Sequence, residues 1–488
     1  MMTPSKKLSI CTLFLLFCSV SKGQERLSLT IGDAIRTAQD STVTAYINEV
    51  SRQKAEWEYR QFLAGRKFQL SLNVNPTYNK YVNTPYLDYF KEYNYNILGA
   101  RAEIRLEQQM NSLGGEFYAA TSALYNEYLA DCKDIDRIFN SIPLGIGYTN
   151  ELLGYNPYKW EKEIETIKFE AASKKYSYNL QQIALEASSY YLDYLVASEE
   201  LRICRTNLDV LSRLYEIAKE KIEIAAITKS ELISIQLQYV NAQNSIYSHE
   251  QTVNDCRKEL LSYLRIEDHG QVLEAKIPEP AGTLEINNDD VVSYALANSP
   301  RMMEVKEKIL KSRQAADKSN IEKGLQLGLD VNVGVQSNSS RIASLFDVPA
   351  SFAVVGVGLS IPLVDHGLAA SRSKAAESEV KIAELEEEDL TRLLILEATS
   401  TLSDFISQQT ILRRTMETLD LADESFQLVE DLYTSGLSDI NTFLLSQISK
   451  DNSYQNYLES LRKYWESYYK LQALCLYDFI RNEPLQWN

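Results

Sequence analysis

The chain has 488 residues, with 50 Lys and Arg against 67 Asp and Glu, and its formal net charge is −17. This acid surplus argues against nucleic acid as a partner, because phosphate binding relies on clustered Lys and Arg. Three His and six scattered Cys argue against a catalytic or structural metal site. Only 18 Gly and 11 Pro leave few turns, which indicates long uninterrupted elements instead of several small domains.

The first residues have the pattern of a secretory signal peptide, which we assign to residues 1–23. Lys6 and Lys7 precede the apolar run Leu8–Phe17, and small or polar residues follow up to Gly23. The apolar run is too short to span a bilayer as a helix, and the alternative is a buried N-terminal helix. We expect no lipid at Cys18, because the residues before it are bulky where a lipidation site would want a small one.

The remaining cysteines give no sign of a disulfide framework. Cys132, Cys204, Cys256 and Cys475 show no close pairing pattern, so we expect buried or incidental thiols, although an exported protein is able to form disulfides. No later segment has about 20 consecutive apolar residues, so the sequence predicts no transmembrane helix.

The chain contains an internal repeat. Residues 68–75 (FQLSLNVN) align with residues 325–332 (LQLGLDVN) at an offset of 257, whereas residues 152–156 align with residues 363–367 at an offset of 211. The first half therefore carries 46 extra residues between these two points. We assign the first repeat to residues 24–270 and the second repeat to residues 271–488.

Both repeats have the same predicted order of elements. In the first repeat a helix leads into strands at 67–79 and 141–153, with a hairpin-like inserted segment at 80–140, and a long helical hairpin follows at 157–265. The second repeat has a helix at 289–323, strands at 324–337 and 352–364, and a long helical hairpin at 368–482. The strands alternate apolar with polar or small residues, which is typical of strands with one apolar face. This pattern fits a sheet half-buried on a soluble core or a transmembrane barrel.

The inserted segment has a strand-like pattern of its own. Residues 98–107 and 117–125 alternate in polarity on either side of Gly114-Gly115, which is typical of a hairpin. One hypothesis adds this hairpin to the barrel, so that each chain contributes six strands instead of four. The other hypothesis, which we prefer, leaves it as an extracellular or luminal appendage, because exposed loops tolerate insertions.

Aromatic residues near the strand ends are candidates for contact with the membrane interface, where Tyr and Trp rings are enriched. They are Tyr78, Tyr81, Tyr155, Tyr158 and Trp160. For Tyr78 and Tyr81 the alternative is packing of a loop on itself.

The helical regions are unusually long. No Gly or Pro occurs in residues 158–269 or in residues 368–435, and the 68 residues of the latter segment would form a helix of about 100 Å. Apolar residues recur at spacings of three and seven, as in coiled coils. We expect the chain to reverse at Ala225-Ala226 and at Ser435-Gly436, where Gly436 suits a left-handed helix end.

The number of strands limits the possible architecture. Four or six strands cannot close a barrel with an open lumen, because small barrels need about eight. A lipid-exposed sheet cannot leave its edges unpaired. Strands that lie in a membrane would therefore have to come from several protomers that share one barrel, and the long helices would extend this barrel as a tube.

Three motifs together are specific to one family. Residues 433–447 (YTSGLSDINTFLLSQ) contain Tyr, two residues and Gly, followed by a stretch that ends in Leu-x-x-Gln. Residues 361–367 (IPLVDHG) form a strand-to-helix join, and residues 295–300 (ALANSP) lie near the start of the predicted helix at 289–323. With these motifs, nearly the whole chain after residue 23 resembles the TolC family of outer-membrane efflux proteins.

The resemblance implies a fold that is mainly α with a membrane β-barrel: a TolC-like trimeric α/β-barrel, with long antiparallel coiled-coil helices and with β-strands shared between protomers. It implies a homotrimer in the outer membrane of a Gram-negative bacterium, with a periplasmic helical tunnel. The implied function is the outer-membrane channel of a tripartite efflux pump or type I secretion system, which conducts small molecules or polypeptides to the exterior. The implied partners are outer-membrane lipid, a periplasmic adaptor (membrane fusion) protein and an inner-membrane RND, ABC or MFS transporter.

The resemblance also implies a functional site at the periplasmic tip of the helical hairpins, where the gate and the adaptor-docking residues lie. The candidates are Ala225, Ala226, Thr228, Lys229, Tyr433, Ser435, Gly436, Ser438, Asp439 and Thr442. Some family members place Asp residues beyond the Gly turn as a constriction, but Thr442 and Leu445 stand at the matching positions here. Asp439 is the nearest acid, and its alternative role is that of a charge at the start of a helix. Tyr433 matches an aromatic residue near the closed mouth of the family's channels.

No catalytic or cofactor-binding motif is found, so we expect no enzyme, no cofactor and no metal. The alternative function is an exported coiled-coil structural or adhesion protein without a pore. Cleavage after Gly23 would remove three Lys and leave a formal charge of −20. An acidic lumen would favour the passage of cations.

Overall fold

The computed structural model describes residues 26–485, except 86–91, 111, 113, 131–135, 152, 225–226, 271, 348 and 436. The predicted signal peptide with Cys18, the thiol of Cys132, and the tip candidates Ala225, Ala226 and Gly436 lie outside the described residues. The chain divides into two compact units. One comprises residues up to 45, 182–284 and 404–470, and we call it the helical unit; the other comprises residues 46–181, 285–403 and 471–488, and we call it the sheet unit.

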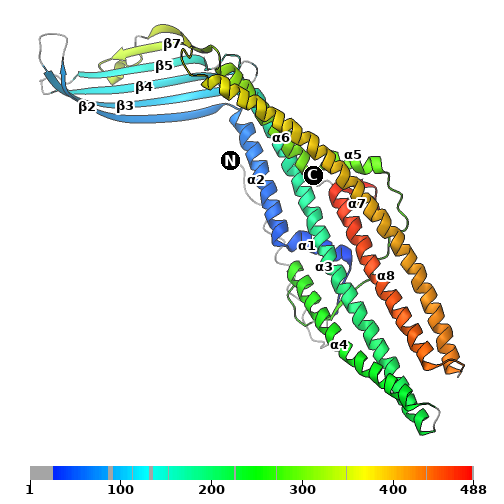
Figure 1. The fold of residues 1–488 in the computed structure, drawn as a ribbon. Coiled ribbons are helices and arrows are strands. Elements are labelled where there is room, and N and C mark those ends of the chain that lie inside the picture. The colour runs from blue at the N-terminus through cyan, green and yellow to red at the C-terminus, as the bar shows by residue number, and fades with distance from the viewer. Residues whose placement is uncertain are drawn as a thin grey trace. The chain divides into compact units, whose positions relative to one another are not determined.

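The sheet unit contains an antiparallel sheet of six strands in the order β2-β3-β4-β5-β7-β8 (Figure 1). The strands are β2 (Gln69–Pro85), β3 (Glu92–Gln109), β4 (Glu116–Ala130), β5 (Asp136–Asn150), β7 (Gln326–Ser339) and β8 (Ala350–Ser360). The first four strands come from the first repeat and the last two from the second. The two repeats join where β5 pairs with β7, with Ile146 opposite Val333.

The inserted segment is part of this sheet. β3 and β4 lie between β2 and β5, with Leu72 opposite Ile104 and Ile104 opposite Thr121. Our preference for an appendage outside the sheet is therefore wrong, because the inserted strands complete the backbone pairing of β2 and β5 as well as their own. Gly114 and Gly115 have φ of 72° and 75°, a left-handed conformation that glycine adopts without strain and that allows the tight turn.

The register gives the sheet two different faces. One row across the six strands reads Leu70, Leu106, Ala119, Ile146, Val333 and Ala353. The neighbouring row, on the opposite face, reads Gln69, Glu107, Tyr118, Gly147, Asn332 and Val354. The described residues leave the apolar face uncovered, since Leu70 is 72% exposed and Val355 is 68% exposed.

The helices of the sheet unit are α2 (Val43–Gly65), α5 (Asn288–Asn298), α6 (Pro300–Glu322) and the first parts of α3 (Pro157–Glu223) and α7 (Leu368–Thr434). The single helix that we predicted at 289–323 is two helices. Pro300 has no N–H to continue α5 and occupies the first position of α6, and Ser299 caps α6 by accepting a hydrogen bond from the Met302 N–H. Short elements complete this unit: a 3₁₀ turn (Ile342–Ser344), β9 (Tyr477–Asp478) and β10 (Glu483–Pro484).

The helical unit contains α1 (Ile31–Ser41), α4 (Lys229–Leu264), most of α8 (Ile440–Cys475) and the second parts of α3 and α7. A parallel pair of strands that the sequence did not predict, β1 (Arg26–Leu29) and β6 (Val272–Ala275), joins the starts of the two repeats. The Tyr191 hydroxyl donates to the carbonyl oxygens of Leu29 (3.0 Å) and Lys276 (2.6 Å), which holds this pair against α3.

Within the described part of the chain, no helix is both long enough and apolar enough to cross a membrane. The thiols of Cys204, Cys256 and Cys475 are free.

Candidate functional site

The start of α4 is fixed by a capping box. The Thr228 hydroxyl accepts a hydrogen bond from the Glu231 N–H (3.2 Å), and the Glu231 carboxylate accepts one from the Thr228 N–H (2.7 Å). These bonds satisfy N–H groups that would otherwise have no partner at the helix end. The hydrogen bond from the Thr228 N–H is the main reason why the pKa of Glu231 is lowered.

The start of α8 is fixed by Asp439. One of its carboxylate oxygens accepts hydrogen bonds from the N–H groups of Asn441 (2.8 Å) and Thr442 (3.0 Å), and the other accepts one from the Thr442 hydroxyl (2.7 Å). The hydroxyl bond is the largest cause of the lowered pKa of Asp439. These contacts favour the role of a helix cap for Asp439 over that of a constriction acid, because all of its bonds go to its own helix.

A cluster of apolar residues packs the two helical hairpins together next to these turns. We call it the tip cluster; it consists of Leu211, Leu214, Ala218, Ile235, Ile440 and Phe443. Tyr433 packs against it, with its ring centroid 5.2 Å from that of Phe443 and with the Lys221 ammonium 5.5 Å from the centre of its ring. Burial raises the pKa of Tyr433. Tyr433 is therefore an anchor within its own chain, and it is not free to project from the tip.

The other described candidates lie on the surface of the same turns. Lys229 is the first residue of α4, Ser435 follows α7, and Ser438 and Thr442 flank Asp439. Thr228, Lys229, Ser435 and Thr442 are exposed, and Ser438 is half-buried. Sequence reasoning missed the tip cluster, although its residues follow the apolar spacing of the long helices.

Comparison with known protein families finds a match within the second repeat. A model of the outer membrane efflux protein family matches residues 291–475, which include all of α6, α7 and α8 and therefore Tyr433, Asp439 and Thr442. Residues 291–475, which we call the efflux protein domain, are therefore similar to this family. This match confirms the resemblance to the TolC family that we drew from the motifs.

Solved structures share the fold of the efflux protein domain and of the rest of the chain. The outer membrane protein VceC from the bacterial pathogen Vibrio cholerae is 13% identical, with a TM-score of 0.57 over 91% of this chain and 95% of that chain. The CmeC outer membrane channel of Campylobacter jejuni is 12% identical, with a TM-score of 0.59 over 94% and 87%. The open state of the MtrE outer membrane channel of Neisseria gonorrhoeae is 11% identical, with a TM-score of 0.60 over 91% and 88%. A search of curated proteins finds no match. The TolC-like fold that we predicted is confirmed.

The aromatic candidates occupy different environments. Tyr78 and Tyr81 on β2 are exposed, at 61% and 39%. Tyr155 is buried, and the Trp160 indole N–H donates to the Asp317 carboxylate of α6 (3.0 Å). Tyr158 is half-buried, and the Arg66 guanidinium donates to its carbonyl oxygen. Tyr78 and Tyr81 are thus exposed on the sheet, whereas Tyr155 and Trp160 pack within the chain.

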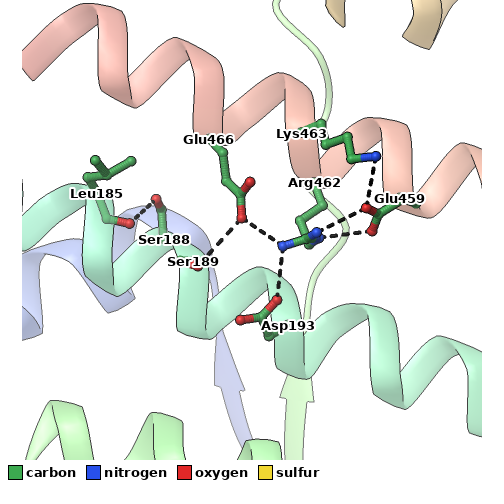
Figure 2. A network of polar contacts seen from close by, with 8 residues as sticks. All are labelled: Leu185, Ser188, Ser189, Asp193, Glu459, Arg462, Lys463 and Glu466. Carbon is green, nitrogen blue, oxygen red and sulfur yellow. Dashed lines mark hydrogen bonds and ion pairs between the residues drawn. The ribbon is translucent and has the colours of Figure 1, made fainter.

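The efflux protein domain also contributes most of a charged network that sequence reasoning missed (Figure 2). Arg462 of α8 donates to both carboxylate oxygens of Glu459 (2.9 Å each) and to Glu466 (2.9 Å). Its guanidinium also reaches Asp193 of α3 (3.4 Å). The spacing of Glu459, Arg462 and Glu466 places them on one side of a helix, but nothing in the sequence indicates that Asp193 faces them.

Burial and the Arg462 guanidinium shift the pKa values of this network in opposite directions. Burial raises the pKa of Asp193 and Glu466, and for each of them the Arg462 guanidinium opposes this rise. The pKa of Glu459 is lowered instead, because Arg462 donates to it. In the described ranges, no group of three or more His, Cys, Asp or Glu residues has the geometry to hold a metal ion. We therefore interpret the network as a link between α3 and α8.

Proposed function

We propose that the chain is the outer-membrane channel of a tripartite efflux pump or type I secretion system. The observation that carries the proposal is the match of residues 291–475 to the outer membrane efflux protein family. The channel would conduct small molecules or exported polypeptides, and the chain itself would perform no catalysis. The alternative, an exported coiled-coil scaffold without a pore, has no support from the family match, and it would have no use for a sheet with an uncovered apolar face.

The two-faced sheet is the part that we assign to the outer membrane. Its uncovered apolar face would contact lipid, and its polar face would contact water, as in membrane barrels. Tyr78 and Tyr81 would lie at the interface between lipid and water.

The edges of the sheet require further chains. Among the described residues, β2 and β8 each pair with one neighbour only. A membrane-embedded edge with unpaired N–H and C=O groups is strongly unfavourable. We therefore propose a homotrimer in which β2 of one protomer pairs with β8 of the next and closes a shared barrel.

The tip of the helical hairpins is the part that we assign to the periplasmic adaptor. Thr228, Lys229, Ser435, Ser438 and Thr442 would form the docking surface, because they lie at the exposed starts and ends of the helices. The tip cluster, with Tyr433 against it, would hold the two turns in place. An inner-membrane RND, ABC or MFS transporter would supply the cargo through the adaptor.

Fractionation and electrophoresis test this proposal. We expect the protein in the outer-membrane fraction of a Gram-negative host, and we expect a trimer band in unheated SDS electrophoresis that becomes a monomer band on heating. A monomer in the soluble periplasmic fraction would overturn the proposal.

A further inference from the structure

We propose that the inserted hairpin β3–β4 forms part of the barrel wall, so that three chains build a barrel of eighteen strands, and that Arg101, Glu103, Arg105 and Glu107 line its lumen. This inference rests on the proposed channel function. It adds the width of the pore and the chemistry of its lining, which the family match does not supply.

The position of the hairpin in the sheet is the first argument. β3 pairs with β2 over nearly its whole length, from Glu107 opposite Gln69 to Glu92 opposite Pro85. β4 pairs with β5 from Glu116 opposite Thr149 onward. A hairpin inserted between two strands of a wall cannot leave it without unpairing both of its neighbours, so these two strands belong to any barrel that the sheet forms.

The internal repeat indicates how many strands the inserted hairpin adds to the barrel. The second repeat contributes two strands, β7 and β8, whereas the first contributes β2 and β5 with β3 and β4 inserted between them. Three chains without the insertion would give twelve strands, and three chains with it give eighteen. With strands about 4.8 Å apart and tilted by about 40°, the barrel diameter between backbones rises from about 24 Å to about 36 Å.

The charges on β3 determine which face is inside. Arg101, Glu103, Arg105 and Glu107 occupy alternate positions and therefore project from one face of the strand. Ala102, Ile104 and Leu106 project from the other. Charged side chains are unfavourable against lipid at the middle of a membrane and are tolerated in a wet lumen, so the charged face must be the inner one.

Arg105 is held in place on this face. Its guanidinium donates to Glu107 (3.2 Å) and to Glu116 of β4 (2.9 Å), and its central carbon lies 3.8 Å from the centre of the Tyr118 ring. Tyr118 is 8% exposed and lies over Gly147 of β5, where an added Cβ would collide with the ring. Through the Tyr118 ring, Arg105 and its two Glu partners thus pack on β5. β5 is the strand of the first repeat that pairs with β7 of the second repeat. This packing fixes the inserted hairpin to the wall by side chains as well as by backbone pairing.

Counting strands is the direct test. Electron cryomicroscopy of the detergent-purified full chain should show eighteen strands in the membrane region of the trimer, six from each protomer. Twelve strands, with β3 and β4 folded into the lumen or outside the wall, would overturn the inference and leave the channel function intact. Absence of a trimer would instead overturn the proposed function.

Spin labels at adjacent positions of β3 give a second test that is independent of the strand count. In lipid vesicles, a label at Ala102→Cys should be severalfold more accessible to oxygen, which partitions into lipid, than to a water-soluble nickel chelate. A label at Glu103→Cys should show the opposite preference. The labelled unsubstituted protein gives the background from its own cysteines. Equal accessibility at the two positions would contradict a hairpin in the wall.

A second pair covers the case in which a β3 variant fails to fold. Thr121 and Ser122 are neighbours on β4, and they lie opposite Ile104 and Glu103 respectively. Thr121→Cys should therefore behave as Ala102→Cys does, and Ser122→Cys as Glu103→Cys does. Retention of the heat-sensitive trimer band shows which variants are folded.

Discussion

Arg462 is the cation at the centre of the ion-pair network between α3 and α8. Its guanidinium contacts three carboxylates, and in the described part of the chain only Glu459 among them has a further cation, Lys463, within reach (3.2 Å). Arg is suited to this position because its planar group donates in several directions at once. Loss of this side chain would leave Asp193 and Glu466 facing each other without a counter-charge.

We expect Arg462→Met to lower the stability of the folded chain at pH 8 by about 2 kcal/mol, because removal of the cation leaves partly buried carboxylates without an opposite charge. The difference in stability between Arg462→Met and the wild type should become smaller as the pH falls towards 5. Asp193 and Glu466 have raised pKa values in the folded state. The folded chain therefore binds their protons more tightly than the unfolded chain does, and protonation removes the repulsion. Thermal midpoints in detergent at pH 5 and pH 8 measure both effects.

Arg392→Met is the matched control for this variant. Arg392 lies on α7, is 70% exposed and pairs with Asp389 three residues away, so its loss should change the midpoint little at either pH. An Arg462→Met deficit that is the same at both pH values would contradict the proposed origin of the effect.

At the scale of elements, the beginnings of α4 and α8 are fixed by local hydrogen bonds. Each beginning has a side chain that occupies the free N–H groups of the first turn: Thr228 for α4 and Asp439 for α8. The docking surface that we propose is built on these first turns. Its shape therefore depends on the caps as much as on the exposed residues.

We expect Asp439→Ala to raise the rate of amide hydrogen exchange in the first turn of α8 severalfold, because the N–H groups of Asn441 and Thr442 lose their acceptor. Asp439→Asn should stay close to the wild type, since an amide oxygen also caps helices well. The pKa of Asp439 is lowered in the folded chain, so its contribution is present above the ordinary carboxyl pKa and is lost as the pH falls through the folded value. Exchange measured by mass spectrometry reports on both variants. Fast exchange in Asp439→Asn as well would show that the turn does not depend on this cap.

Much of the fold could be predicted from the sequence, because its strand and helix patterns extend over many residues. Strict alternation predicted strands in the regions of β2, β5, β7 and β8, and the segments free of Gly and Pro predicted the long helices. The break between α5 and α6 at Pro300 was missed because helical periodicity continues across it. The pairing of β1 with β6 was missed because strands of four residues carry too short a pattern.

The partners within the sites were less predictable than the elements. Asp439 could be named from its place after the turn, because a cap is a local signal. Asp193 could not, because it meets Arg462 only through the packing of α3 on α8. The place of the inserted hairpin was misjudged for a similar reason: its alternation showed that it forms strands, but pairing with β2 and β5 is a property of the folded sheet.

At the scale of the whole molecule, the acid surplus bears on what a channel would pass. The full sequence has 17 more acidic than basic residues, the predicted cleavage would leave an excess of 20, and the proposed trimer would carry this excess three times. Fields of one sign in a narrow, water-filled space attract counter-ions. This favours cations over anions in the lumen.

We expect the purified trimer in a planar bilayer with a KCl gradient to show a reversal potential of the sign for cation preference at pH 7. The preference should weaken at pH 4, where ordinary carboxyl groups begin to take up protons. Glu103→Gln should reduce the preference if its side chain lines the lumen, and Ile104→Val, at the next position on the other face, should leave it unchanged. Anion preference at pH 7 would contradict this expectation.

The pairing of β5 with β7 has a consequence for the order in which the chain acquires its structure. β5 ends at Asn150 and β7 begins at Gln326, with α3, α4, α5 and α6 between them. During synthesis and export, the edge of β5 that pairs with β7 therefore stays open until β7 arrives, and closure over so long a separation is slow. An open strand edge is a template for unwanted pairing between chains. Because this junction unites the two repeats, we expect the unfinished chain to aggregate more readily than the finished one until residue 326 has followed.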